Sequence, residues 1–229
     1  MTVSIIIPTY NEEKNIGELV KFLANNKDSS IVDIIVSDAG SQDSTAEYAT
    51  QAGAKVVVSP QKGRSAQMNY GANLANGNIL YFIHADCRPP ESFCQDIQQA
   101  MCEGFDMGRY RTKFNSKRNI LKVNSWITRF DLFICMGGDQ TLFIKTSLFK
   151  KCGGFMEEMK IMEEYDFCKR ARSVGKYKIL KGKAFISDRK YNTNSWLQVQ
   201  LANLKIIRMY KKGATQQQMV ETYSRLLKL

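Results

Sequence analysis

Three short polar segments of this 229-residue sequence each follow a run of β-branched or aromatic residues. They are Pro8 to Glu12 (PTYNE), Ser37 to Ser44 (SDAGSQDS) and His84 to Asp86 (HAD). Asp86 is the most informative of these residues, because a carboxylate at the end of an apolar strand is costly unless it is solvated or paired. Mg²⁺ and Mn²⁺ usually take one or two carboxylates together with phosphate oxygens. The segment therefore predicts a divalent cation that joins Asp86 to a diphosphate.

Two residues near Asp86 have several readings. His84 lies two residues earlier on the same face of an extended strand. It is therefore a metal ligand, a residue that contacts and orients the ligand, or a core histidine. Asp38 follows the second strand, where a carboxylate either accepts hydrogen bonds from a ribose or base, or shapes the turn and caps the next helix. The residues alone leave these alternatives open.

Charged residues at the start of two helical segments suit the same site. Arg64 opens a segment that continues through Asn69, and an arginine at a helix N-terminus favours an anionic group. Glu163, Glu164 and Asp166 open another segment, where the helix dipole alone would favour carboxylates. The functional reading is that one of the three is a general base that takes a proton from an acceptor hydroxyl.

Alternating strands and helices must position these residues. Hydrophobic patterns predict strands at 3–7, 31–37, 54–59 and 79–84, and helices at 13–25, 44–52 and 64–75. This order predicts a mostly parallel sheet with right-handed crossovers, and the three polar segments would meet at the carboxyl ends of its strands. Later expected elements are a strand at 138–145, a helix at 163–174, short strands at 177–180 and 184–187, and amphipathic helices at 195–210 and 215–228.

The composition is typical of a folded protein, with 44% hydrophobic and 24% charged residues. Six cysteines without a C-x-x-C pair, beside a single histidine, argue against a zinc site or a disulfide framework. No run approaches the roughly 18 apolar residues that span a bilayer, and the N-terminus lacks the basic start of a secretory signal. A cytoplasmic location is therefore expected.

The net charge of +11 is spread from residue 109 to the end of the chain. Such a surplus attracts phosphorylated molecules, anionic lipid or nucleic acid, although a solvated basic surface explains it equally well. The basic C-terminal helices suit peripheral contact with the inner face of the cell membrane. The favoured alternative is that their apolar faces pack on the domain or on a second subunit of a homodimer.

Six segments taken in order resemble a known family: IIIPTYNEE, VSDAGSQDST, GRSAQMNYGA, FIHADCRPP, GGDQTLFIKTSLFKKCGGF and MEEYDFCKRAR. They resemble the family 2 glycosyltransferases over about residues 3–190, and most of all a small bacterial subgroup associated with radical-SAM and selenium-related gene clusters. The resemblance implies the GT-A fold, an α/β, Rossmann-like mixed and mostly parallel sheet flanked by helices, with a helical tail. Residues 1–194 would form this domain, with 1–90 as its nucleotide-binding half and 91–194 as its acceptor half, and 195–229 would pack on it.

The resemblance implies an inverting transfer of a sugar from a nucleotide-diphosphate donor, with a UDP-sugar favoured, assisted by Mn²⁺ or Mg²⁺. The acceptor hydroxyl is unidentified and belongs to a small molecule, a lipid-linked molecule or a glycan; no nucleic-acid partner is implied. The nucleotide-sugar site would comprise Pro8, Thr9, Glu12, Asp38, Arg64, Asn69, His84, Ala85 and Asp86, of which Asp86 binds the metal. The acceptor side would comprise Gly138, Asp139 and Gln140.

The sequence departs from the family pattern at three places. His84 stands where the family's D-x-D motif has its first Asp, and Glu164 stands where its E-D motif has the catalytic Asp, so Asp166 is an alternative base. The downstream histidine that completes the metal shell in some relatives is absent. The resemblance thus implies a cation with Asp86 as its one protein ligand, dependent on the phosphates of the donor.

Three other classes fit the sequence less well. A nucleotidyltransferase acting on a sugar phosphate would have a glycine-rich, basic first loop, whereas this loop reads Thr-Tyr-Asn-Glu-Glu. A dinucleotide-dependent oxidoreductase would show G-x-G-x-x-G after the first strand. The non-enzymatic alternative is a basic module that binds a membrane surface or nucleic acid.

Overall fold

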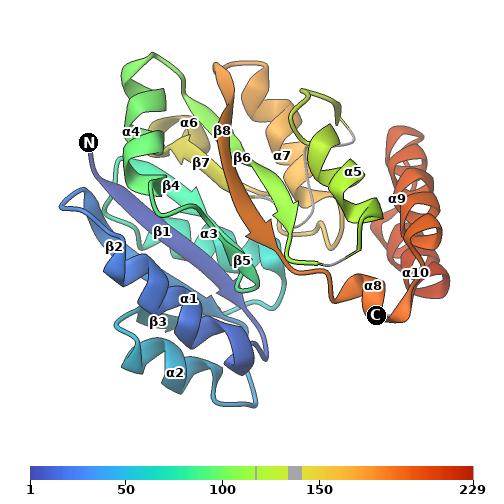
Figure 1. Ribbon diagram of the computed structural model, residues 1–229, viewed down its shortest axis with the longest axis horizontal. Coiled ribbons are helices and arrows are strands. Elements are labelled where there is room, and N and C mark those ends of the chain that lie inside the picture. The colour runs from blue at the N-terminus through green and yellow to red at the C-terminus, as the bar shows by residue number, and fades with distance from the viewer. Residues whose placement is uncertain (117, 134–140, 229) are drawn as a thin grey trace.

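The computed structural model describes residues 1–116, 118–133 and 141–228 of the chain. In this part of the chain, one sheet of eight strands has the order β3-β2-β1-β4-β7-β6-β8-β5. Helices cover both faces of the sheet, and the last two long helices lie beyond one end of it (Figure 1). The predicted α/β class with a mixed, mostly parallel sheet and a helical tail is therefore confirmed.

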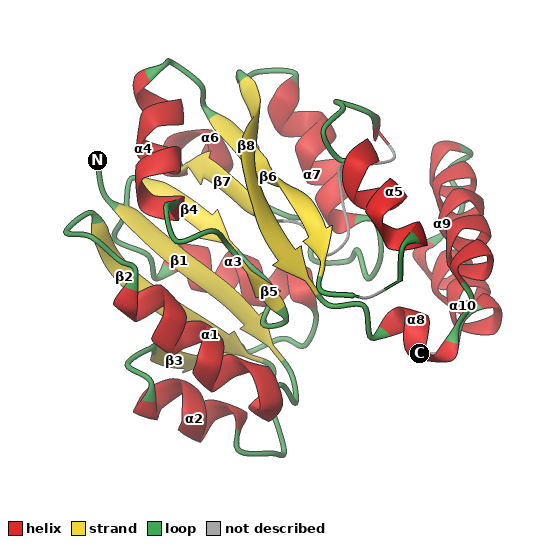
Figure 2. Cartoon of the chain, viewed as in Figure 1, coloured by secondary structure: helices red, strands yellow, loops and turns green. Residues whose placement is uncertain are grey.

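The first half of the chain forms a parallel block whose strands alternate with helices (Figure 2). Each predicted element is present to within about two residues at each end. The strands are β1 (Val3–Thr9), β2 (Ile31–Asp38), β3 (Lys55–Val58) and β4 (Ile79–Phe82), and the helices are α1 (Glu13–Asn25), α2 (Thr45–Gln51) and α3 (Arg64–Asn73). Every residue of β1 is buried, as a central strand covered on both faces requires.

The second half joins antiparallel strands to this block. Its elements are β5 (Cys87–Arg88), α4 (Phe93–Cys102), β6 (Met107–Phe114), α5 (Ile120–Ile127), β7 (Leu142–Lys145), α6 (Thr146–Lys151), α7 (Glu163–Arg172), β8 (Tyr177–Ile186) and α8 (Lys190–Thr193). The two short strands expected at 177–180 and 184–187 are one strand, β8, whose register shifts where Tyr110 pairs with Leu180 and Arg111 with Lys183. The strand expected at 138–145 begins at Leu142 in the described residues.

Two hydrophobic clusters fix the sheet between its helices. On one face, side chains of α1, α2 and α4 such as Leu23, Ala49 and Ile97 pack on the sheet. On the other face, α3, α6 and α7 contribute residues such as Met68 and Phe167. Because both faces are covered, only the ends of the strands are open to a ligand, and the carboxyl ends of β1, β2 and β4 lie together.

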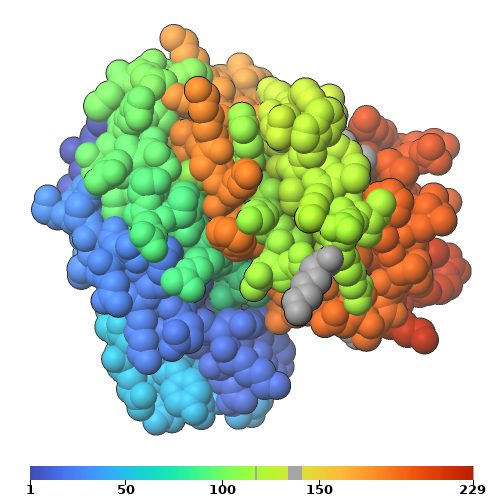
Figure 3. Space-filling model, in the orientation of Figure 1, coloured from blue at the N-terminus to red at the C-terminus, as the bar shows by residue number. Residues whose placement is uncertain are grey.

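The helices α9 (Trp196–Lys211) and α10 (Gln216–Leu226) extend this architecture. The buried face of α9 joins two clusters, one containing Leu121 and Tyr191, the other containing Met159 and Met162. In the space-filling view, these helices (orange to red) lie against the yellow-green segment around α5 (Figure 3). Among the described residues, no helix has the length and apolarity needed to cross a membrane.

Candidate functional site

Two of the three polar segments singled out in the sequence, those that follow β1 and β4, line one cavity, which we call the small cavity. It has a volume of about 180 Å³. Its lining includes seven residues expected to bind the nucleotide-sugar, together with three that were not named for that role. The lining is Pro8, Thr9, Tyr10, Glu12, Arg64, Gln67, His84, Ala85, Asp86 and Arg189.

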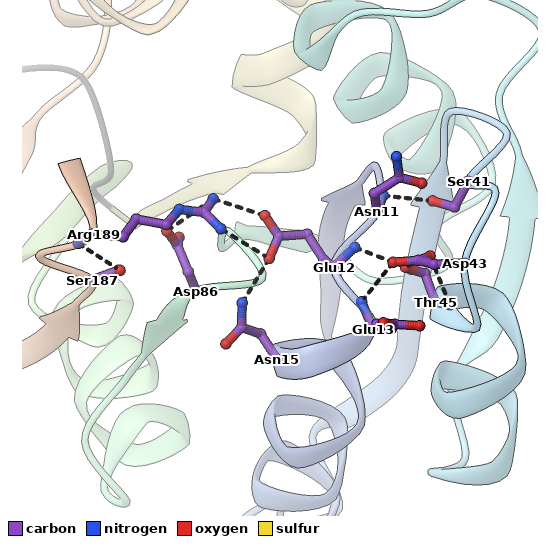
Figure 4. Close-up of polar contacts among 10 residues, drawn as sticks. All are labelled: Asn11, Glu12, Glu13, Asn15, Ser41, Asp43, Thr45, Asp86, Ser187 and Arg189. Atoms are coloured by element: carbon purple, nitrogen blue, oxygen red, sulfur yellow. Dashed lines mark hydrogen bonds and ion pairs between the residues drawn. The ribbon is translucent and has the colours of Figure 1, made fainter. Parts of the chain in front are cut away.

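The loops that follow β1 and β2 are bonded to each other beside this cavity (Figure 4). The backbone N–H of Asn11 donates to Ser41 Oγ at 2.9 Å, and that of Glu12 donates to Thr45 Oγ1 at 2.8 Å. Asn11 has a left-handed backbone (φ 54°), which asparagine tolerates better than most residues. The two loops therefore form one connected unit.

Asp38 is buried and accepts four hydrogen bonds. Its oxygens accept from Thr9 Oγ1 at 3.0 Å, Ser41 Oγ at 2.6 Å and the backbone N–H groups of Gly40 and Ser41 at 2.9 and 2.7 Å. These bonds use most of the acceptor capacity of a carboxylate. The turn-shaping role considered from the sequence is therefore what the structure shows, and contact with a ribose or base stays a prediction.

Asp86 satisfies part of what a divalent cation requires. Its carboxylate lines the small cavity and its side chain is 15% exposed, so an oxygen faces the space that a diphosphate would enter. In the described part of the chain, no three His, Cys, Asp or Glu residues form a group that could hold a metal ion by themselves. The residues fit a cation that takes its remaining oxygens from phosphates and water.

Arg189 forms an ion pair with Asp86. Its Nη2 lies 3.3 Å from Asp86 Oδ2 and 2.8 Å from Glu12 Oε1 (Figure 4). The pairing of Cys87 with Ile186 between β5 and β8 brings the chain after β8 beside Asp86. The ion pair of Arg189 with Asp86 therefore links residues about 100 positions apart.

His84 contacts Glu164, the predicted base. Its Nε2 is 3.0 Å from Glu164 Oε1, and both side chains are nearly enclosed. Glu164 is in the first turn of α7, which follows Met162 in a left-handed conformation (φ 68°). A left-handed methionine is strained, so the neighbouring contacts must hold it in place. The arrangement fixes Glu164 against the end of β4.

Arg64 and Glu163 form an ion pair next to this contact. Arg64 Nε lies 3.1 Å from Glu163 Oε1, and Glu163 is almost completely buried. Burial raises the pKa of the Glu163 carboxyl, and the guanidinium of Arg64 opposes that rise. Arg64 was predicted to bind an anionic group. It lines the small cavity, and its guanidinium already forms an ion pair with Glu163.

A second, larger cavity of about 440 Å³ lies on the other side of Arg64, and we call it the large cavity. This size is within the range of pockets for small molecules. Glu163 and Glu164 line it, and α5, α9 and α10 contribute to its remaining walls, which carry many aliphatic side chains. Arg64 lines both cavities, so they are neighbours at this residue.

Three predicted site residues of the described chain line neither cavity: Asp38, Asp166 and Asn69. Asp166 accepts from Arg170 Nε at 2.7 Å and from Tyr210 Oη at 3.1 Å, so it joins α7 to α9. Asn69 Nδ2 donates to the Phe155 carbonyl at 2.8 Å, and Phe155 N–H donates back to Asn69 Oδ1 at 2.9 Å. Gly138, Asp139 and Gln140 lie outside the described residues.

Replacing Asn69 with alanine should lower the free energy of unfolding by about 1–3 kcal/mol, because it leaves backbone groups of Phe155 without their partner. Asn73→Ala is the matched control on the exposed side of the same helix, and its effect should stay within about 0.5 kcal/mol. Urea unfolding measures both. Equal effects of the two variants would contradict a structural role for Asn69.

Sequence reasoning missed Tyr10, Gln67 and Arg189 as members of the site. Gln67 is buried, and its Nε2 donates to the carbonyls of Thr9 at 2.7 Å and Ser37 at 2.8 Å, which ties the ends of β1 and β2 together. The segment 64–75 also carries Arg64, Ser65, Asn69 and Asn73, so no local signal distinguished Gln67 from its polar neighbours. No local pattern pointed to Arg189.

Comparison with protein families matches residues 4–156 to the family described as Glycosyl transferase family 2. Among curated proteins, the dolichol-phosphate mannosyltransferase of Pyrococcus furiosus is 32% identical over 112 residues, which cover 47% of this chain and 32% of that protein. The glucosyl-3-phosphoglycerate synthase of Mycolicibacterium smegmatis is 33% identical over 98 residues, covering 39% and 32%. These alignments span about a third of the length of either relative.

Solved structures resemble nearly the whole chain. S. aureus TarS 1-349 in complex with UDP-GlcNAc has a TM-score of 0.68 at 19% identity, with 99% of this chain and 71% of that chain covered. Glucosyl-3-phosphoglycerate synthase from Mycobacterium tuberculosis, in complex with Mn²⁺, UDP and glucosyl-3-phosphoglycerate, has a TM-score of 0.62 at 16% identity, covering 93% and 81%. At these identities, the likeness shows a shared fold.

Proposed function

Because the chain belongs to glycosyl transferase family 2, whose GT-A fold it shares, we propose that it transfers a sugar from a UDP-sugar to an acceptor hydroxyl with inversion at the anomeric carbon. The relatives support the donor and the cation: one solved relative binds UDP-GlcNAc, and another binds UDP with Mn²⁺. Family membership makes a nucleotidyltransferase or a non-catalytic binding module the less favoured alternatives.

The observation that carries this proposal is the continuity from Asp86 through His84 to Glu164. Asp86 lines the small cavity, Glu164 lines the large one, and His84 lies two residues from the first and 3.0 Å from the second. A donor in the small cavity and an acceptor in the large cavity would therefore meet beside Arg64. Inverting transfer needs the base and the leaving group on opposite sides of the anomeric carbon, and two adjoining cavities suit that requirement.

The residues would divide the chemistry as follows. Glu164 takes the proton of the acceptor hydroxyl while the oxygen of that hydroxyl forms a bond to the anomeric carbon. The bond from that carbon to the diphosphate breaks, and the diphosphate keeps the electron pair. His84 holds the Glu164 carboxylate in place. A divalent cation at Asp86, when bound, offsets the charge that develops on the diphosphate.

The acceptor site is proposed at the large cavity. Its aliphatic walls and its lysines, Lys160 and Lys190, suit an acceptor with both apolar and anionic parts. The roles of Gly138, Asp139 and Gln140 on the acceptor side stay part of this proposal. So does the division into a nucleotide-binding half at 1–90 and an acceptor half at 91–194.

Two finer assignments belong to the same proposal. His84, in place of the first Asp of the D-x-D motif, supports the subgroup associated with radical-SAM and selenium-related gene clusters. On α9, Leu197 and Leu201 are more than half exposed and Lys205 and Arg208 follow them, which supports peripheral contact with the inner face of the cell membrane.

A thermal-shift panel of nucleotide-sugars, with and without Mn²⁺, tests the function. A donor at 100 times its Kd should stabilise the fold by about 2.7 kcal/mol, which raises the Tm by about 5–10 °C in a chain of this size. We expect the largest shift from a UDP-sugar with Mn²⁺ present, and a smaller shift without the metal. If no nucleoside diphosphate or nucleotide-sugar shifts the Tm under either condition, the proposed function is wrong.

A further inference from the structure

Arg189 holds two carboxylates that belong to different parts of the proposed donor site. Its guanidinium contacts Glu12, from the loop after β1, and Asp86, from the end of the β4 segment (Figure 4). Both carboxylates are mostly enclosed, with side-chain exposures of 14% and 15%. Arg189 itself reaches them from the solvent side, since 61% of its side chain is exposed. It therefore covers the small cavity with a positive charge.

The Asp86 carboxylate would have two cationic partners in this arrangement. Asp86 Oδ2 is 3.3 Å from Arg189 Nη2, and the Asp86 carboxylate is also the group that fits a divalent cation. A guanidinium and a divalent cation that bind the same carboxylate share its negative charge, so each weakens the binding of the other. Arg189 therefore competes with the metal for Asp86 as long as it stays in this position.

The exposed guanidinium of Arg189 can easily leave Asp86 for another anionic partner. Ion pairs with an exposed partner contribute little free energy, because water and salt screen them. A diphosphate offers a better partner, since the planar guanidinium binds two phosphate oxygens at once and phosphate carries more charge than a single carboxylate. A diphosphate that enters the small cavity would contact Arg189 at the entrance of that cavity.

We infer that Arg189 binds the donor diphosphate and, by leaving Asp86, releases that carboxylate for the divalent cation. This inference rests on the proposed function and deepens it. Without a donor, Arg189 lowers the affinity of Asp86 for the cation. With a donor, Arg189 moves to the diphosphate, so that donor and cation strengthen each other's binding, as linkage requires.

Calorimetric titration of Mn²⁺ and UDP, separately and together, tests this role in wild type and Arg189→Gln. In the variant, Mn²⁺ alone should bind about two- to five-fold more tightly, because its competitor is gone. UDP alone should bind about ten-fold more weakly, because a charged hydrogen-bond donor is lost. The factor by which UDP tightens Mn²⁺ binding should fall. Arg189→Lys keeps the charge without the planar fork, and should restore UDP binding only in part.

Arg225→Gln is the matched control, because Arg225 is exposed and lines neither cavity. It should leave all three affinities as in wild type. If wild type binds UDP and Mn²⁺ but Arg189→Gln changes neither affinity, the pair is an ordinary surface contact and the inference is overturned. If wild type binds no nucleoside diphosphate, the proposed function fails and this inference fails with it.

Discussion

Replacing Asp86 with alanine is expected to lower the rate of sugar transfer at least about 100-fold, because it removes the one carboxylate proposed to hold the cation beside the leaving diphosphate. Loss of several kcal/mol of charge stabilisation has an effect of this size. The fold should stay intact, since Arg189 keeps its shorter contact with Glu12. Transfer assays with UDP-sugars and a Tm measurement check both statements.

Two further variants test whether the effect comes from the charge of Asp86 in particular: Asp86→Asn and the control Glu47→Ala. Asparagine keeps the shape of Asp86 but removes its charge, so it should behave like alanine in transfer and in its lost response to Mn²⁺. Glu47 is an exposed carboxylate on α2, and its loss should change nothing. Full activity of Asp86→Ala would remove the metal role from this residue.

Glu164→Gln is expected to lower kcat by about 10²–10⁴-fold, the usual contribution of a general base, with the affinity for UDP within about two-fold of wild type. Glutamine keeps the size of the side chain and can still contact His84, but it cannot take a proton from the acceptor. We expect kcat to fall without a change in UDP affinity because Glu164 lines the large cavity and not the small one. Steady-state kinetics and UDP titration measure the two effects.

Asp166→Asn distinguishes the two candidate bases. Because Asp166 bonds Arg170 and Tyr210 and lines neither cavity, this variant should keep kcat within a few-fold and lose stability instead. A Glu164→Gln enzyme that loses UDP binding would show that Glu164 has a different task. A large fall in kcat for Asp166→Asn alone would move the base to Asp166.

The parallel half of the sheet could be predicted because its signals are local. In β1, the run Val3 to Ile7 is continuously apolar, as a strand covered on both faces must be. The helix at 13–25 was predicted within the same bounds, since Ile16, Val20 and Leu23 recur at helical spacing and are all buried. Such patterns need no knowledge of distant contacts.

Strand β6 shows why the second half was harder to predict. It reads MGRYRTKF, with a cation at every second or third position, which is typical of a solvated segment. Arg109 is nevertheless buried, and its Nη1 donates to the carbonyl of Tyr110 and its Nη2 to that of Phe130, while its Nε has no hydrogen-bond partner among the described residues. The carbonyls that accept from this arginine come together only after the fold has formed.

In the site, too, some features follow from local sequence patterns and others depend on contacts between distant residues. The segments after β1 and β4 line one cavity as predicted, and the segment after β2 is bonded to the first of them without lining it, because the carboxyl ends of parallel strands meet at one edge of a sheet. Arg189 could not be placed, because its position depends on the register of β5 with β8, between residues about 100 positions apart. The contact between His84 and Glu164 likewise joins two segments that were read separately.

The two cavities are encoded by different stretches of the chain. Apart from Arg189, the small cavity is lined by residues 8–86, whereas the large cavity, apart from Arg64, is lined by residues 112–128 and 160–224. Mutations that reshape one cavity can therefore accumulate with little disturbance to the other. An ancestral gene could change the molecule it modifies while keeping the same activated sugar, and Arg64 and Arg189 are the positions at which such divergence would be most constrained.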